Sequence, residues 1–341
     1  MGDRTEPAGE GERLGAGRGL LLWCLFFAMA FGLGYPTLNR YDTRKMGTDW
    51  DEYYRMVDHQ GPAIDFPFSG RVLVPAIARP FYLLAQGRSG TWNPVMFGLL
   101  VSNCIFCASA AFFLLLIGLR VLGDMPLALL GCTLYLLNFV VSNLWLAGMV
   151  DSSEGCLMLA LMWCLFAGRW WMLPLIGIAG GLAKQSFLPF SVVFATAWWL
   201  VAERPNKRYW KLGWVAALGC ACAATMALMA RAAAGHTQSL WAMAEWWNIR
   251  RGYWGSFLHV LREQQLWYAF VWLLPLGVWR LNRLPKAWVT ASIAAGVCAL
   301  GLGVFASMGG TVNRPLFNVM GPILSVSVAL LLGDGAQLRR S

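Results

Sequence analysis

Charged residues are scarce in this chain. Asp, Glu, Lys and Arg make up 13% of the 341 residues, whereas apolar side chains make up 58%. Soluble domains average about 25% charged and about 45–50% apolar residues, so the composition excludes a disordered chain and argues against a soluble enzyme. A bilayer-spanning helix needs about 20 mostly apolar residues, and ten such helices would use roughly 200 residues. The sequence therefore predicts an all-α polytopic membrane protein.

Cysteine and histidine offer little chemistry. All nine cysteines fall inside apolar segments, where a buried thiol behaves as a small hydrophobic side chain, so we expect no disulfide framework. Cys104 and Cys107 form a CxxC pair, but no second pair accompanies it, so we expect no metal site there. Only three histidines are present, and isolated ones such as His236 and His259 are expected to be structural.

Acidic residues are outnumbered, with 17 Asp and Glu against 27 Lys and Arg, which gives a net charge of +10. The basic residues are scattered over short loops, so they indicate membrane orientation and lipid headgroup contact, and we expect no nucleic acid partner. An even number of predicted spans separates the basic loops 203–211 and 279–286, so both loops lie on the same side of the membrane. Both are therefore expected on the cytoplasmic side with the two chain ends, which leaves 39–92 and 233–263 as long outer loops.

Apolar runs predict about ten transmembrane helices in a single domain, residues 19–333. In this interpretation residues 1–18 form a disordered cytoplasmic tail and residues 334–341 form a second cytoplasmic tail. Residues 72–86 are apolar but contain two prolines and Arg79, which favours a helix on the membrane surface or one that re-enters the membrane. The predicted spans are 19–38, 93–119, 125–147, 155–168, 171–183, 187–202, 212–232, 264–280, 287–308 and 315–333.

The first outer loop, 39–92, collects carboxylates. A long loop in a small membrane protein is more often functional than merely connecting, although a solvated loop with headgroup-facing charges is the alternative. The carboxylates are Asp42, Asp49, Asp51, Glu52, Asp58 and Asp65, and they are interleaved with Arg40, Arg44, Lys45, Arg55, Arg71 and Arg79.

Four segments resemble one family of membrane enzymes. GTDWDEYY at 47–54 resembles the G-x-D-x-x-x-Y-Y signature that follows the first helix of GT-C superfamily glycosyltransferases. PFSGRVLVPAIA at 67–78 is similar to the P-F-x-x-R-x-L-x-P segment of bacterial members. GLAKQSFLPF at 181–190 resembles their A-x-x-K-E-x-x-L stretch, with Gln185 in place of the usual Glu, and 313–332 resembles their last span.

The resemblance implies a location, a fold and a reaction. It implies a bacterial inner-membrane protein whose long first periplasmic loop carries surface helices. It also implies a polyprenyl-phosphate-sugar donor, a periplasmic glycan, lipid or protein acceptor, and no cofactor. Asp49 matches the catalytic Asp of the family.

The chemistry of glycosyl transfer agrees with that role for Asp49. Transfer to a hydroxyl needs a base near the acceptor oxygen, and partial desolvation at the water–membrane boundary raises the pKa of a carboxylate towards the working range. We therefore expect Asp49 to be the general base, with Asp51 and Glu52 as alternates. A divalent metal ion held by Asp49 and Asp51 is a further alternative.

The leaving lipid phosphate needs positive charge and no general acid. Lys184 and Arg314 adjoin apolar runs, where charge is costly and often functional, although either side chain could instead extend to the outer headgroups. Asp151 and Glu154 could join the same site or cap a helix. The candidate substrate- and phosphate-binding residues are Arg71, Lys184, Arg250, Arg251, Arg314, Tyr53, Asp151 and Glu154.

Two other functions are open to this sequence. A transporter or flippase of a lipid-linked or anionic solute should carry charge near the middle of its spans, often in repeated halves. Here the predicted spans have almost no charge at their centres, and no internal repeat is present. A non-catalytic subunit of an envelope polysaccharide assembly is the third possibility, because Gln185 departs from the family pattern. The carboxylates of one outer loop favour a membrane glycosyltransferase.

Overall fold

The computed structural model describes residues 15–42, 48–59, 68–88, 92–234, 252–306 and 312–338. Within these ranges the chain forms helices and connecting turns without any β-strand. The helices are α1 (Ala16–Arg40), α2 (Thr48–Asp58), α3 (Leu73–Ala85), α4 (Pro94–Leu122), α5 (Met125–Leu136), α6 (Asp151–Phe166), α7 (Leu173–Ala183), α8 (Phe187–Ala202), α9 (Trp210–Ala234), α11 (Gly252–Arg262), α12 (Gln264–Phe270), α13 (Leu273–Val278), α14 (Lys286–Ala306) and α15 (Asn313–Leu338).

Five helices, α1, α4, α9, α14 and α15, are long and apolar enough to cross a membrane. They coincide with five of the ten predicted spans. Shorter apolar helices are α3, α5, α8 and the stretch Trp170–Ala183, which includes α7. The part of the chain that is described therefore confirms an all-α architecture, with five helices that are long and apolar enough to cross a membrane.

Two predicted spans are not continuous helices. The predicted span 125–147 ends as α5 at Leu136, because the Asn138 side chain accepts a hydrogen bond from the backbone N–H of Val140 (3.0 Å) and so competes with the helical ladder. The predicted span 264–280 divides into α12 and α13. Pro275 lies in the first turn of α13, where its missing N–H costs no hydrogen bond, whereas it would interrupt one long helix.

Three predicted boundaries also shift. α1 begins at Ala16, so the N-terminal residues 16–18 are helical and do not belong to a tail. α15 continues to Leu338 and takes up most of the predicted C-terminal tail. The predicted span 155–168 begins earlier, because α6 starts at Asp151 with two carboxylates in its first turn, where the helix dipole favours negative charge.

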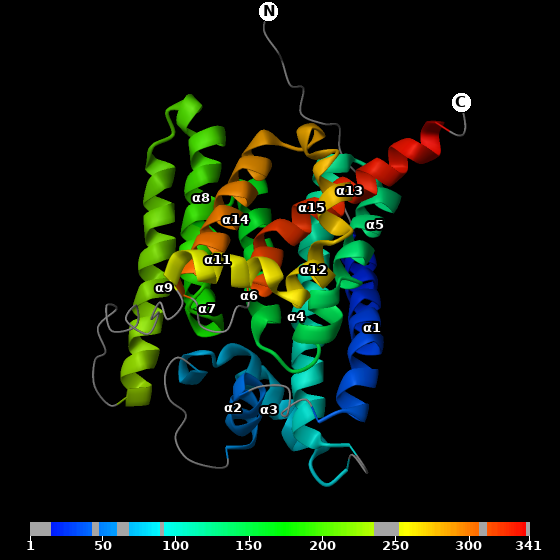
Figure 1. The fold of residues 1–341 in the computed structure, drawn as a ribbon, viewed down its shortest axis with the longest axis vertical. Coiled ribbons are helices and arrows are strands. Elements are labelled where there is room, and N and C mark those ends of the chain that lie inside the picture. The colour runs from blue at the N-terminus through cyan, green and yellow to red at the C-terminus, as the bar shows by residue number, and fades with distance from the viewer. Residues whose placement is uncertain are drawn as a thin grey trace, which may run out of the picture.

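The helices form a bundle with two distinct ends (Figure 1). α2 and α3 lie together at one end, which we call the α2 end. The connection between α8 and α9, the connection between α13 and α14, and the last turns of α15 lie at the opposite end. Arg283 and Asp334 join two of these segments through an ion pair of 2.8 Å. The two basic loops of the sequence therefore share the end opposite to α2.

α3 packs along α4, with Val74, Ala78 and Tyr82 buried on the contacting face at a spacing of four residues. Gly98 makes this close approach possible, because a Cβ there would lie 2.6 Å from the carbonyl oxygen of Ala78. The apolar segment expected to lie on the membrane surface or to re-enter the membrane is thus a helix packed against a long span.

Unequal helix lengths leave room at the α2 end. α4 has 29 residues, whereas α6 has 16 and α7 has 11, which correspond to about 44, 24 and 17 Å of helix. Figure 1 shows α6 and α7 ending short of α2, while α1, α4 and α9 extend further in that direction. The turn η2 (Phe68–Gly70) contacts α7 and α9 there. α2 and η2 therefore cover the ends of the short helices.

Candidate functional site

Asp151 lies at the centre of a buried group of charged side chains. It opens α6, and Glu154 follows three residues later on the same face of the helix. The exposed fractions of these side chains are 1% and 0%. Two carboxylates withdrawn from water in this way require compensating charge close by.

Lys184 supplies part of that charge. α7 ends at Ala183 and Lys184 has an extended backbone, so its side chain leaves the break between α7 and α8. The Nζ atom binds Oδ1 of Asp151 and lies 4.0 Å from Oε2 of Glu154. Gly180 permits the tight connection, because a Cβ at this position would collide with the buried ring of Phe187.

Arg314 supplies the second cation, from the first turn of α15. Its Nη1 atom donates to Oδ2 of Asp151 at 2.9 Å, so the two oxygens of one carboxylate hold two cations. Asn313 precedes it, and its Nδ2 donates to Oε1 of Gln265 at 2.9 Å. The beginning of α15 is thereby held against both α6 and α12.

Arg71 and two residues of α2 complete the group. Arg71 Nη1 donates to the Tyr53 hydroxyl oxygen at 2.6 Å and lies 3.8 Å from Oδ2 of Asp49. Its Nε donates to Oε1 of Gln185 at 3.0 Å. Burial raises the pKa of Tyr53 to about 12, with the Asp49 and Asp151 charges adding to the rise, so the phenol stays protonated at neutral pH.

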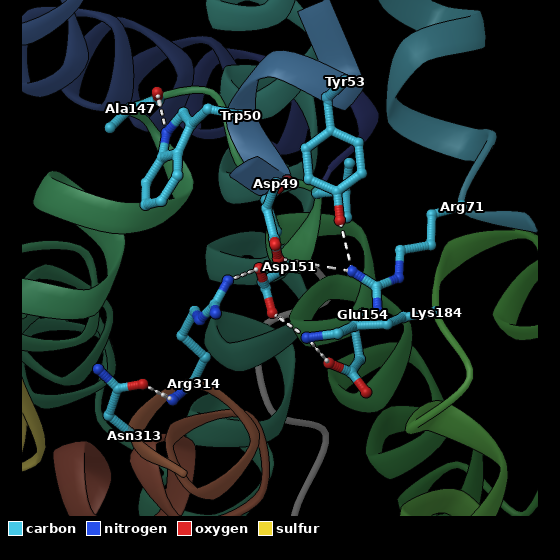
Figure 2. A network of polar contacts seen from close by, with 12 residues as sticks. Asp49, Trp50, Tyr53, Arg71, Ala147, Asp151, Glu154, Lys184, Asn313 and Arg314 are labelled. Carbon is cyan, nitrogen blue, oxygen red and sulfur yellow. Dashed lines mark hydrogen bonds and ion pairs between the residues drawn. The ribbon is translucent and has the colours of Figure 1, made fainter. Parts of the chain in front are cut away.

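We call these seven side chains the ion network: Asp49, Tyr53, Arg71, Asp151, Glu154, Lys184 and Arg314. Figure 2 shows Arg314 and Lys184 reaching Asp151 from different elements, with Asp49 next to Asp151 and Arg71 beside Tyr53. Three carboxylates meet three cations, so the formal charges cancel. Asp49 is the most exposed charged member at 32%, so its carboxylate is the charged group of the network most accessible to a solute.

The three candidate bases on α2 do not have the same partners. Asp49 faces the network, whereas Asp51 and Glu52 pair with Arg55 at 3.2 and 2.6 Å. Asp49 and Tyr53 are four residues apart and share one face of α2. The geometry therefore brings only Asp49 of the three candidate bases to the network.

The geometry of α2 also applies to the alternative in which Asp49 and Asp51 together hold a divalent metal ion. Two carboxylates two residues apart on one helix diverge by about 200° around the helix axis. Across the described ranges, no group of three or more His, Cys, Asp or Glu residues is arranged to hold a metal ion. The predicted phosphate ligands Arg250 and Arg251 lie outside the described residues.

Three neutral polar residues that the sequence did not single out as ligands support the network. Ser186 Oγ donates to Oε1 of Glu154 at 2.5 Å, and Asn318 Nδ2 donates to its Oε2 at 2.8 Å. Gln185, noted only as a departure from the family pattern, accepts from Arg71. Asn318 carried a signal in the sequence, because it is a single amide inside the apolar run 315–333 and buried polar groups need partners.

An apolar groove lies among the helices of the C-terminal part of the chain. It has a volume of about 310 Å³, and α11, α12, α13, α14 and α15 contribute to it. Leu316 and Met320 line it from α15, and Ile293 and Gly296 line it from α14. We call it the α15 groove. Arg314 does not line it, because a residue two positions before Leu316 lies about 200° away around the axis of α15.

No family model matches this sequence, and the search of curated proteins finds no significant relative. The function is therefore inferred from the geometry of the ion network, the α15 groove and the resemblance in the motifs.

Proposed function

We propose that the protein is a membrane glycosyltransferase that moves a sugar from a polyprenyl-phosphate carrier to a periplasmic glycan, lipid or protein acceptor. The observation that supports this most is the convergence of Asp49 with Arg71, Lys184 and Arg314 at one covered end of the bundle. The motifs that resemble GT-C enzymes supply four members of this constellation. These are Asp49, Arg71, Lys184 and Arg314.

Asp49 is the base in this proposal. Its carboxylate takes the proton of the acceptor hydroxyl while the acceptor oxygen forms a bond to the anomeric carbon. The bond between the anomeric carbon and the phosphate oxygen breaks, and the electron pair leaves with the lipid phosphate. A single displacement of this kind inverts the anomeric configuration. The exposure of Asp49 fits a base that must meet a solute acceptor.

Arg71, Lys184 and Arg314 receive the negative charge of the leaving phosphate. A guanidinium carries five N–H donors and an ammonium three, so each cation can bind phosphate while retaining its contact to Asp151 or Tyr53. Asp151 serves as a positioning residue, because its two oxygens fix Lys184 and Arg314. Glu154, whose Oε2 lies 4.0 Å from Nζ of Lys184, supplies a second negative charge beside this cation.

The α15 groove is suited to the chain of the carrier. Its lining is apolar, and Leu316 and Met320 of α15 contribute to it. A polyprenyl chain has no polar atoms, so such a lining binds it by burial of apolar surface alone. We propose that the phosphate of the same donor lies at the ion network.

The proposal also assigns an orientation. The α2 end faces the periplasm, and both basic loops face the cytoplasm with the two chain ends, in the bacterial inner membrane. The excess of Lys and Arg in loops 203–211 and 279–286 supports this assignment.

The decisive experiment uses purified protein in liposomes with a panel of radiolabelled polyprenyl-phosphate sugars. Asp49→Asn keeps the size of the side chain and removes the base, so transfer should fall by about 10²–10⁴-fold while donor binding persists. Asp51→Asn is the matched control, since it changes the same charge on the same helix at the Arg55 ion pair, and it should keep near-normal transfer. Full activity in Asp49→Asn would contradict the role of Asp49.

A transporter of an anionic solute is the second candidate. Fully buried Asp151 and Glu154 among membrane helices favour it, because such residues often mark solute pathways. The same liposomes separate the two functions. Donor uptake or flipping without product would support transport, whereas labelled acceptor product would support glycosyl transfer.

A further inference from the structure

A second groove shares no lining residue with the ion network or the α15 groove. We call it the α3 groove. It has a volume of about 570 Å³ and lies between α1, the end of α3 and the start of α4. Sites for small ligands usually measure roughly 300–1,000 Å³. The α3 groove is therefore large enough to take part of a lipid molecule.

One wall of the α3 groove is a row of neighbouring aromatic rings. The ring centroids are 6.0 Å apart for Phe31 and Tyr35, 5.0 Å for Tyr35 and Trp92, and 5.6 Å for Trp92 and Phe97. Leu84, 63% exposed, lines the groove from α3. Tyr and Trp side chains beside apolar surface are typical of the membrane interface, where rings contact chains and polar tips contact headgroups.

Arg88 gives this apolar groove a single cation. The residue lies in the turn after α3, and its backbone N–H donates to the carbonyl of Ala85 at 3.0 Å, which fixes it at the groove. Its side chain is exposed, and no carboxylate among the described residues forms an ion pair with it. A guanidinium of this kind is suited to bidentate binding of a phosphate group.

We propose that the α3 groove binds one acidic phospholipid, with an acyl chain along the aromatic wall and the headgroup phosphate at Arg88. Charge complementarity selects this occupant, because a zwitterionic lipid brings an ammonium group next to the same phosphate and gains less from a lone cation. The bound lipid bridges α1, α3 and α4. It also steadies α2 indirectly, since the Tyr82 hydroxyl of α3 donates to Oδ1 of Asp58 at 2.7 Å.

Native mass spectrometry tests this proposal directly. Purified full-length protein in detergent is titrated with phosphatidylglycerol and with phosphatidylcholine that carry identical chains. We expect phosphatidylglycerol to bind more tightly, and Arg88→Gln to weaken its affinity about fivefold, the effect of one cation near an anionic headgroup. Arg40→Gln is the matched control, because Arg40 is exposed in the last turn of α1 and does not line the groove. Soluble glycerol phosphate should not compete, since it lacks the chain.

Leu84→Asp tests the position of the chain. Leu84 is exposed, so the variant should fold, and its carboxylate should weaken binding of both lipids. Equal affinity of wild-type protein for the two lipids would overturn the proposal, as would equal losses in Arg88→Gln and Arg40→Gln. Unchanged binding in Leu84→Asp would place the lipid elsewhere and overturn it too. None of these outcomes depends on glycosyl transfer.

Discussion

Asp151 joins two cations from distant parts of the chain. Removing its charge in Asp151→Asn leaves Lys184 and Arg314 buried without their main partner, and breaking a buried pair in this way costs about 3–5 kcal/mol. We expect the free energy of unfolding in detergent to fall by about that amount. Denaturant or thermal unfolding of the purified variant measures it.

Asp334 provides a control at the opposite end of the bundle. Its carboxylate also contacts two cations, Arg280 at 3.0 Å and Arg283 at 2.8 Å, but its side chain is 20% exposed. Ion pairs that water can reach contribute less than buried ones, about 0–1 kcal/mol at the surface, so Asp334→Asn should change stability less than Asp151→Asn. A comparable loss in both variants would show that burial does not set the importance of Asp151.

Glu263 makes stability depend on pH. Burial raises the pKa of this carboxyl to about 7, while the backbone N–H of Val312 and the charge of Arg314 oppose the rise. The folded state therefore binds more protons than the unfolded state between about pH 4.5 and 7. Its stabilising contribution is present below pH 4.5 and is lost as the pH rises through 7.

Thermal unfolding of wild-type protein and Glu263→Gln checks this dependence. The Tm of the wild type should fall relative to that of Glu263→Gln between pH 5 and pH 8, and the difference should be constant above that range. Other titrating groups are common to both proteins and cancel in the comparison. A Tm difference that is the same at every pH would contradict the shifted pKa.

At the scale of elements, the connection between α7 and α8 places Lys184. A Cβ on Gly180 would lie 1.9 Å from Cδ1 of the fully buried Phe187, so Gly180→Ala must displace that ring. Overpacking of this kind costs about 1–3 kcal/mol. We expect a lower Tm, and a fall in transfer activity larger than that loss of folded protein explains.

Gly213→Ala in α9 is the matched change, because a Cβ there has no atom within 4 Å. Alanine is the better helix former by about 1 kcal/mol, so this variant should be as stable as the wild type or more so. Thermal unfolding and sugar transfer are measured side by side for the two variants. If both variants were destabilised, displacement of the Phe187 ring would not explain the effect of Gly180→Ala.

The sequence predicts the long elements well and the broken ones poorly. α1, α4, α9, α14 and α15 contain long apolar windows, which by themselves indicate a span. The predicted spans 125–147 and 264–280 failed because Asn138 and Pro275 stop helices locally without changing the mean apolar character. A running average of hydropathy cannot detect such single residues.

The candidate site also has residues that the sequence predicts and contacts that it does not. Lys184 and Arg314 were identifiable, since an isolated charge beside an apolar run is costly. The pairing of Asp151 with Arg314 was not, because 163 residues separate them and only tertiary packing brings them together. Asp49 could be told apart from Asp51 only once Thr48 was known to begin a helix, which fixes the direction of each side chain.

At the scale of the whole molecule, the two ends of the bundle should lie on opposite sides of the membrane. Gln86 is exposed at the α2 end and Asn206 is exposed in the connection between α8 and α9. In intact cells a membrane-impermeant thiol reagent should label Gln86→Cys, and Asn206→Cys should react only after permeabilisation. The wild type, with its nine native cysteines, sets the background. The reverse pattern would invert the proposed orientation.

The separation of Asp151 from its partners has a consequence for biosynthesis. Lys184 follows Asp151 by 33 residues, but Arg314 follows it by 163. At about 5–20 residues per second a ribosome needs roughly 8–30 s to reach Arg314 after Asp151. During that interval Asp151 lacks its second counter-ion. Its carboxylate must then be solvated by water or by polar groups of the insertion machinery. α15 thus completes the electrostatic assembly of α6, a helix that is made much earlier in synthesis.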